Sequence, residues 1–221
     1  MAAQTPKGNM PVVVLKDDAS QVKGREAQKN NIAAAKIIAE IVHTSLGPKG
    51  MDKMLVDSLG DVTITNDGAT ILKEIDVQHP AAKMLVEISK TTDNEVGDGT
   101  TSAVVLAGAL LEHAETLVLQ DVHPTIIVDG YRKAGRKAKE FLDQIADNVS
   151  PTDNGILLKI AKTSMQTKLV RKDSEQLGDM IVKAVKAVAE KNGEKYTVDI
   201  DDIKVEKKAG GSIKDSKIIQ G

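Results

Sequence analysis

The stretch Gly97-Asp98-Gly99-Thr100-Thr101 leads directly into an apolar run over residues 102–119 that has the length of a long helix. Glycine lets the backbone approach an anion closely, and the free N–H groups at the start of a helix favour negative charge. Asp98 supplies a hard oxygen ligand of the kind that Mg²⁺ prefers beside substrate phosphates. The pattern therefore predicts a helix whose start holds a phosphate and its metal. The simpler alternative is a helix cap, in which Asp98 or Thr100 accepts hydrogen bonds from the first N–H groups.

Two further glycine-containing loops stand at the ends of expected elements. Leu46-Gly47-Pro48-Lys49-Gly50 follows a helical pattern over residues 24–46 and places a cation beside a tight backbone, which suits a base or a phosphate. The alternative for this loop is a helix stop followed by a turn. Asn66-Asp67-Gly68 follows a hairpin expected from Lys53–Val56 and Val62–Thr65. Taken alone, this tripeptide is typical of a turn.

Together, the three loops carry one lysine and two carboxylates in a chain that has no cysteine. Such an inventory suits phosphoryl transfer, which asks a protein mainly for positioning, Mg²⁺ and a group that orients water. No segment matches the P-loop pattern G-x-x-x-x-G-K-[ST], and no G-x-G-x-x-G opens a strand–helix–strand unit, so both of these nucleotide-binding motifs are excluded. The four histidines do not form ligand pairs, so we expect each to be structural or exposed. They are His43, His79, His113 and His123.

The composition excludes several classes of protein. The chain has 221 residues, a net charge of −2, and only two tyrosines and one phenylalanine as aromatic residues. A nucleic-acid-binding protein would normally present a basic face or aromatic stacking platforms. The longest apolar runs, such as residues 103–111, are shorter than the roughly 20 residues that span a bilayer, and the first ten residues lack the apolar core of a signal peptide. These features predict a cytoplasmic protein with an aliphatic core and with neither a nucleic-acid nor a membrane partner.

The rest of the pattern is mainly helical, and a domain boundary is expected in the turn-forming residues 148–154. Further helices are expected over residues 80–92, 100–119, 124–146, 156–165 and 177–189. Extended segments are expected at residues 12–15 and 204–208, and the β pattern continues through the Gly210-Gly211 turn towards the end of the chain.

Three motifs, in this order and spacing, closely resemble those of a group II chaperonin of the archaeal thermosome type. They are Thr44-Ser45-Leu46-Gly47-Pro48-Lys49-Gly50-Met51-Asp52-Lys53-Met54-Leu55, Asn66-Asp67-Gly68-Ala69-Thr70-Ile71-Leu72 and Val96-Gly97-Asp98-Gly99-Thr100-Thr101. The resemblance extends over essentially the whole chain. It implies a mainly α-helical fold, in which a multihelical equatorial ATP-binding domain over residues 1–147 carries a β-hairpin stem-loop and an N-terminal strand. Residues 148–221 would then form the first part of a small α/β intermediate domain.

The resemblance also implies a role for each motif. Asp98 would ligate Mg²⁺, and Asp67 would be one of two acids that orient the attacking water. Lys168 would sense the γ-phosphate, although Met165-Gln166-Thr167 lacks the glycine often found before that lysine. The other residues would contact ATP. Those lining the nucleotide or holding phosphate oxygens would be Ser45, Leu46, Gly47, Pro48, Gly68, Gly99, Thr100, Thr101 and Ser102.

The implied function is that of an ATP-dependent folding chaperone, assembled as a ring of identical or related subunits that acts on unfolded proteins in the cytoplasm. Its cofactors would be ATP and Mg²⁺. The hairpin and residues 12–15 would pair with neighbouring subunits. A usual subunit is more than twice this long, and its second water-orienting acid lies in the later part, so we expect hydrolysis to be impaired in this polypeptide alone. The alternative is a truncated nucleotide-binding or ring-interaction fragment without hydrolysis.

Overall fold

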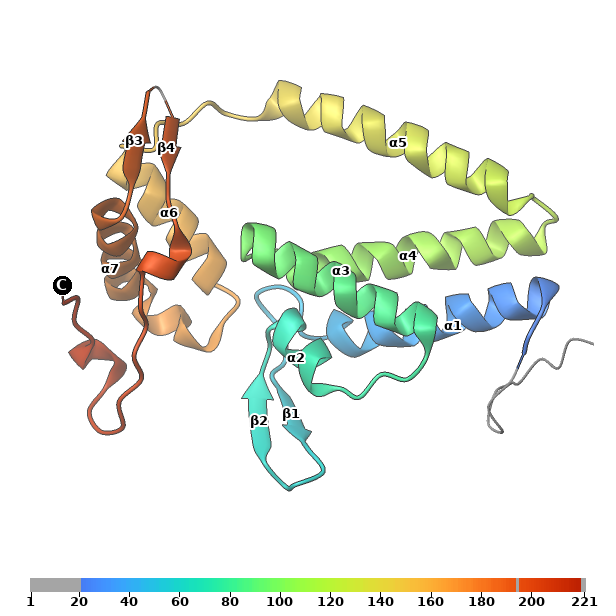
Figure 1. Ribbon diagram of the computed structural model, residues 1–221, viewed down its shortest axis with the longest axis horizontal. Coiled ribbons are helices and arrows are strands. Elements are labelled where there is room, and N and C mark those ends of the chain that lie inside the picture. Colours follow the sequence, from blue (N-terminus) through green and yellow to red (C-terminus); the bar gives the residue numbers. More distant parts are fainter. Residues whose placement is uncertain (1–20, 194, 220–221) are drawn as a thin grey trace, which may run out of the picture.

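The computed structural model describes residues 21–193 and 195–219, and this part of the chain is mainly α-helical (Figure 1). The predicted fold class is therefore confirmed. The α-helices are α1 Gly24–His43, α2 Gly68–Glu74, α3 Pro80–Val96, α4 Thr100–Leu119, α5 Pro124–Ile145, α6 Asn154–Met165 and α7 Ser174–Ala187. The strands are β1 Lys53–Val56, β2 Val62–Thr65, β3 Glu190–Asn192 and β4 Lys195–Thr197, and the short 3-10 turns are η1 Leu169–Asp173, η2 Ile200–Asp202 and η3 Ile213–Asp215.

The core lies where α1, α2, α3 and α4 meet. Its largest fully buried side chains, Ile71, Leu72, Val42 and Val104, are aliphatic, as the composition predicts, and Ser89 is a polar side chain buried with them. Burying a side chain of this size stabilises the fold by about 1.5–3 kcal/mol. The short helix that the Asp67 loop begins is thus anchored in the core, because Ile71 and Leu72 belong to it.

Helices α1 and α4 pack unusually closely. A Cβ atom added to Gly108 of α4 would lie 2.2 Å from the Cβ of Ala39 in α1, which is too close for two methyl groups. The same helix pair is joined by an ion pair between Lys36 and Glu115 at 3.1 Å, and hydrogen bonding to Glu115 raises the pKa of Lys36. Glycine at position 108 therefore sets the distance between the two longest helices of the core.

Helix α4 is long and apolar enough to cross a membrane by length and composition alone. The lengths of the uninterrupted apolar runs in the sequence did not predict this. The length and composition of α4 are weak evidence for a membrane span, because a core helix meets the same test. Helix α4 packs against α1 and α3, and Figure 1 shows it lying between them and α5.

Two helices begin with a His-Pro pair that acts as a cap. The Nδ1 atom of His79 accepts the N–H of Ala81, and that of His123 accepts the N–H of Thr125. The following prolines suit the first helical turn because they have no N–H group to leave unpaired. His43 and His113 are exposed, so the expectation that the histidines are structural or at the surface is confirmed.

The hairpin β1–β2 forms over the predicted residues, with Lys53 opposite Thr65 and Val56 opposite Val62. Side chains alternate between its two faces, and one face is apolar and exposed. That face carries Met54, Val56, Val62 and Ile64. The expected strand at residues 12–15 lies outside the described residues.

Two β predictions near the end of the chain are wrong. Residues 204–208 form no strand, and residues 213–219 contain the 3-10 turn η3 instead of β structure. No strand among the described residues lies beside residues 204–208, and Val205 is 79% exposed. Neither strand pairing nor burial therefore stabilises an extended strand there. The β structure of this part is the hairpin β3–β4, with Lys191 opposite Tyr196. Residues 146–153 contain no helix or strand, and a division into domains at this point stays a prediction.

Candidate functional site

The starts of α2 and α4 lie against each other through a glycine. The N–H of Gly68 donates to the hydroxyl oxygen of Thr101 at 3.1 Å. A Cβ atom at position 68 would lie 2.4 Å from this oxygen and 2.9 Å from the Cα of Thr101, so only glycine fits without a backbone shift. This contact brings the Asn66-Asp67-Gly68 loop to the start of α4, as the site hypothesis requires.

The start of α4 has no side-chain cap. Its N-cap residue is Gly99, which has a φ of 77°, and Gly97 has a φ of 72°, so both glycines occupy the left-handed region that other residues avoid. Asp98 is exposed, and its Oδ1 accepts only the N–H of Gly99, at 2.8 Å, rather than an N–H inside the helix. The alternative of an ordinary Asp98 or Thr100 cap is therefore wrong. The first N–H groups of this long helix therefore have no side-chain cap, and its positive end favours an anion.

Asp67 caps α2 and pairs with a distant lysine. One carboxylate oxygen, Oδ2, accepts the N–H and the hydroxyl of Thr70, each at 3.0 Å. The other, Oδ1, accepts the ammonium group of Lys168 at 2.6 Å, and both side chains are about one-third exposed. The structure thus places the predicted catalytic acid beside the predicted phosphate-sensing lysine, which is 101 positions away in the sequence.

The segment from Ser164 to Lys168 touches both loops. In addition to the lysine contact, the hydroxyl of Ser164 donates to Oδ2 of Asp98 at 2.8 Å, and the side-chain amide of Asn66 donates to the carbonyl oxygen of Thr167 at 2.5 Å. One short stretch at the end of α6 is therefore joined to both of the predicted functional acids.

The third loop, residues 46–50, closes on itself. The hydroxyl of Ser45 is buried and donates to the carbonyl oxygen of Val42 at 2.7 Å, while Gly47 has a φ of 84° and its carbonyl oxygen accepts the N–H of Gly50. No hydrogen bond among the described residues joins this loop to the other two. It nonetheless follows the end of α1 that lies beside the start of α4 (Figure 1). Its backbone, rather than the Ser45 hydroxyl, is what it can offer to a ligand.

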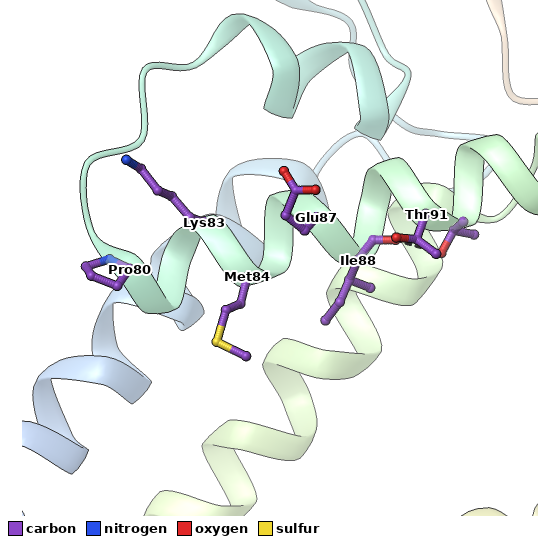
Figure 2. Close-up of a pocket in the computed structure, with 7 residues that line it drawn as sticks. Pro80, Lys83, Met84, Glu87, Ile88 and Thr91 are labelled. Carbon is purple, nitrogen blue, oxygen red and sulfur yellow. Dashed lines mark hydrogen bonds between the residues drawn. The ribbon is translucent and has the colours of Figure 1, made fainter.

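A hollow of about 470 Å³ runs along the exposed side of α3, and Figure 2 shows it. It is lined by Pro80, Lys83, Met84, Glu87, Ile88, Thr91 and Thr92. None of these is a predicted site residue, and the walls are mostly apolar, so this hollow does not offer the chemistry of the three loops. The candidate site is instead an open surface between loops.

The sequence matches the TCP-1/cpn60 chaperonin family over residues 38–221. The chain belongs to this chaperonin family. Among curated relatives, it is 59% identical to thermosome subunit beta of Thermococcus kodakarensis over 211 residues, which is 96% of this chain and 39% of that protein. It is 56% identical to a thermosome subunit of Pyrococcus abyssi, over 96% of this chain and 38% of the relative, and 57% identical to thermosome subunit alpha of Archaeoglobus fulgidus, over 96% and 39%. The chain spans about two fifths of the length of these relatives.

Three residues of this chaperonin chain take part in the arrangement without having been predicted. Thr70 lies three positions after Asp67, which is the spacing of a helix cap, so this contact could have been anticipated from sequence. Asn66 and Ser164 each bond to a partner that lies far away in the chain, at a separation of 101 and 66 positions. No local pattern marks such contacts.

The ion pair in the chaperonin site predicts a dependence of stability on pH. Partial burial acts to raise the pKa of Asp67, but hydrogen bonds from Lys168 and Thr70, with the charge of Lys168, outweigh it and lower that pKa below its ordinary 3.8. The stability that Asp67 contributes is therefore present above pH 3.8 and lost as the pH falls through the folded-state pKa. Urea unfolding of the wild type and of Asp67→Asn at a series of pH values should show a stability difference that shrinks in this acidic range. A difference that stays constant to far lower pH would contradict this account.

Proposed function

We propose that this chain is part of a thermosome-type chaperonin subunit that binds Mg-ATP at the three loops and, in the complete protein, hydrolyses it to drive protein folding. The observation that carries the proposal is the convergence of Asp98, Asp67 and Lys168 at the uncapped start of α4. These residues come from three separate segments, and they combine two carboxylates and a cation beside the positive end of a helix. Such a combination suits phosphoryl transfer, which needs positioning, Mg²⁺ and a group that orients water.

The residues present fit a magnesium–phosphate group. The free N–H groups at the start of α4 would hold phosphate oxygens, with the hydroxyl of Thr100 or Ser102 and the backbone of Gly99 beside them. Asp98 is exposed and would ligate Mg²⁺. No cluster of three metal-binding side chains occurs in residues 21–193 and 195–219, so the remaining ligands would be phosphate oxygens and water. When bound, Mg²⁺ would neutralise charge that develops on the phosphates.

Asp67 would act on the attacking water. Because the contacts from Lys168 and Thr70 lower its pKa, the carboxylate is ionised near neutral pH and can accept a hydrogen bond from water. A positioned acceptor of this kind orients the water and accepts its proton. Lys168 forms an ion pair with the same carboxylate. It would respond to the γ-phosphate, because this phosphate would be a second anionic partner for its ammonium group.

Exposed apolar surfaces support assembly with further protein. One is the face of the hairpin β1–β2 that contains Met54 and Ile64, and another is on α5, where Phe141, Leu142 and Ile145 are each more than half exposed. Helix α5 touches little besides α4 in the described structure, and Figure 1 shows it extending away from the core. We propose that a ring of related subunits covers these surfaces and that the protein works on unfolded proteins in the cytoplasm. We further propose the equatorial and intermediate domains over residues 1–147 and 148–221.

The alternative function, a fragment that binds nucleotide or ring partners without hydrolysis, is less favoured. The match to thermosome subunits covers 96% of the chain, including the segment that carries Lys168, and the proposed water-orienting role of Asp67 would go unused in a protein that never turns over ATP. The two functions differ in a simple observation, because the alternative predicts nucleotide binding without phosphate release by the complete protein.

Asp98→Asn should weaken Mg²⁺-dependent ADP binding on the order of 100-fold, about 2.8 kcal/mol at 1.4 kcal/mol for each factor of ten. The variant keeps an oxygen that can accept the N–H of Gly99, and its amide group can donate to the hydroxyl oxygen of Ser164, but it removes the charge that attracts the metal. Isothermal titration calorimetry with ADP, in the presence and absence of Mg²⁺, measures this effect. Asp93→Asn, a nearby exposed acid with no predicted role, is the matched control. Equal Mg²⁺ dependence in the wild type and in Asp98→Asn would refute the proposed metal site.

A further inference from the structure

The hydroxyl of Ser164 is hydrogen-bonded to the Asp98 carboxylate, which the proposed function assigns as a ligand of Mg²⁺. It donates to Oδ2 of Asp98 at 2.8 Å, while the N–H of Gly99 donates to Oδ1 at the same distance. Each oxygen of Asp98 therefore accepts one hydrogen bond, from α6 on one side and from its own loop on the other. We propose that Ser164 is a positioning residue that orients the Asp98 carboxylate for the metal, an inference that rests on the proposed function.

The lone pairs of the carboxylate leave room for a metal. An ionised carboxylate offers about four acceptor sites, so two hydrogen bonds leave one site free on each oxygen. A donor that does not touch the metal itself can orient a ligand in this way, and partners of this kind strongly affect metal affinity. Ser164 would act through Asp98 without touching the metal.

Asp98 has few other means of holding one orientation. Its side chain is exposed, and it stands between two glycines in left-handed conformations, with φ of 72° and 77°. The hydrogen bond from the N–H of Gly99 comes from the adjacent residue, so it moves with the loop and does not fix the carboxylate relative to the rest of the fold. The hydrogen bond from Ser164 is the contact that fixes the carboxylate relative to a separate part of the fold.

Ser164 itself is held in place independently of Asp98. The adjacent Met165 is buried at 7% exposure, and its methyl group lies close to Gly178 of α7. On the other side, the carbonyl oxygen of Thr167 and the ammonium group of Lys168 are bonded to Asn66 and Asp67. The hydroxyl is thus presented from a packed helix end, which is what a positioning group requires.

Mn²⁺ uptake in the presence of ADP tests this role without any hydrolysis. Electron paramagnetic resonance of free Mn²⁺, titrated with the full chain and ADP, should show about tenfold weaker Mn²⁺ binding in Ser164→Ala, the low end of the range for outer ligand partners because this site is open to solvent. Ser164→Thr keeps the hydroxyl and should bind nearly as the wild type does. Ser164→Ala should fold, because alanine is the better helix former.

Two controls separate positioning from mere attachment of α6. Thr163→Ala removes an adjacent hydroxyl that donates to the carbonyl oxygen of Lys159 within its own helix, and it should leave Mn²⁺ uptake unchanged. Asn66→Ala removes another contact of the same segment without touching Asp98. If Asn66→Ala weakens Mn²⁺ binding as much as Ser164→Ala does, Ser164 serves only as a tether and the inference is overturned.

The remaining outcomes are also decisive. Wild-type Mn²⁺ affinity in Ser164→Ala overturns the inference and leaves the Mg-nucleotide site standing. A wild-type chain that takes up no Mn²⁺ with ADP overturns both the proposed function and this inference. Tenfold weakening in Ser164→Ala, with recovery in Ser164→Thr and no change in Thr163→Ala, supports it.

Discussion

Replacing Asp67 with asparagine should lower the rate of ATP hydrolysis by the complete chaperonin about 10²–10⁴-fold, the usual contribution of a positioned general base. Asparagine keeps an oxygen that can accept the N–H of Thr70, so the cap of α2 survives. What it removes is the negative charge that would orient and deprotonate the attacking water. ADP affinity should therefore change little while the release of phosphate nearly stops. A steady-state phosphate-release assay and a titration with ADP measure the two quantities.

Asp153→Asn is the matched control for this experiment. Asp153 caps α6 through the N–H groups of Gly155 and Ile156, so the same substitution is made at a helix cap that does not lie in the candidate site. This variant should hydrolyse ATP at the wild-type rate. If Asp67→Asn retained most of its hydrolysis, or if both variants lost it equally, Asp67 would not be the water-orienting acid.

Replacing Gly108 with alanine should destabilise the fold by about 1–2 kcal/mol. Overpacking of this kind costs about 1–3 kcal/mol, and the better helix propensity of alanine returns about 0.5–1 kcal/mol. The cost wins because the new methyl group would lie 2.2 Å from the Cβ of Ala39, and neither group can rotate away. Helices α1 and α4 must then move apart. Urea unfolding, followed by circular dichroism, gives the change in the free energy of unfolding.

A swap and a control test the cause of that loss. In the double variant Ala39→Gly with Gly108→Ala, the methyl group moves from one helix to the other, and the Cα of residue 39 lies at an ordinary contact distance of 3.8 Å. Most of the stability should return. Gly130→Ala, in α5, meets no atom within 4 Å and should stabilise by about 0.5–1 kcal/mol through helix propensity alone. Destabilisation that persists in the swap would show that the close approach is not the cause.

Local sequence patterns were sufficient to predict most of the long helices and the first hairpin. The helices α1, α3, α4 and α5 have apolar spacing that is visible in the sequence, α3 and α5 also begin with a His-Pro pair, and each of the four begins where the sequence predicts it. The hairpin β1–β2 is likewise predicted by two short β-forming runs on either side of a turn. Glycines at positions 97 and 99 were also informative, because their left-handed backbone leaves Asp98 outside the helix rather than capping it.

Other features depend on contacts that no short window contains. Helix α2 has only seven residues, and it is held by burial of Ile71 and Leu72 rather than by its own pattern. The alternation at residues 204–208 predicts a strand, but a strand needs a partner, and the described structure provides none there. The ion pair of Lys168 with Asp67 depends on how the end of α6 lies against the loops, and it was not predicted from the sequence, which assigned Lys168 to the site only through the family resemblance.

The central claim is that the loops around Asp67 and Asp98 form one Mg-nucleotide site at the start of α4. Crystals of the protein grown with Mn²⁺ in place of Mg²⁺, together with ADP, test it most directly, because anomalous scattering locates the metal without any assumption about the site. Our account predicts a single strong manganese peak bonded to Asp98, with the phosphates of ADP on the N–H groups that begin α4. A manganese–ADP complex located elsewhere, or ADP bound with Asp98 free of metal, would contradict it.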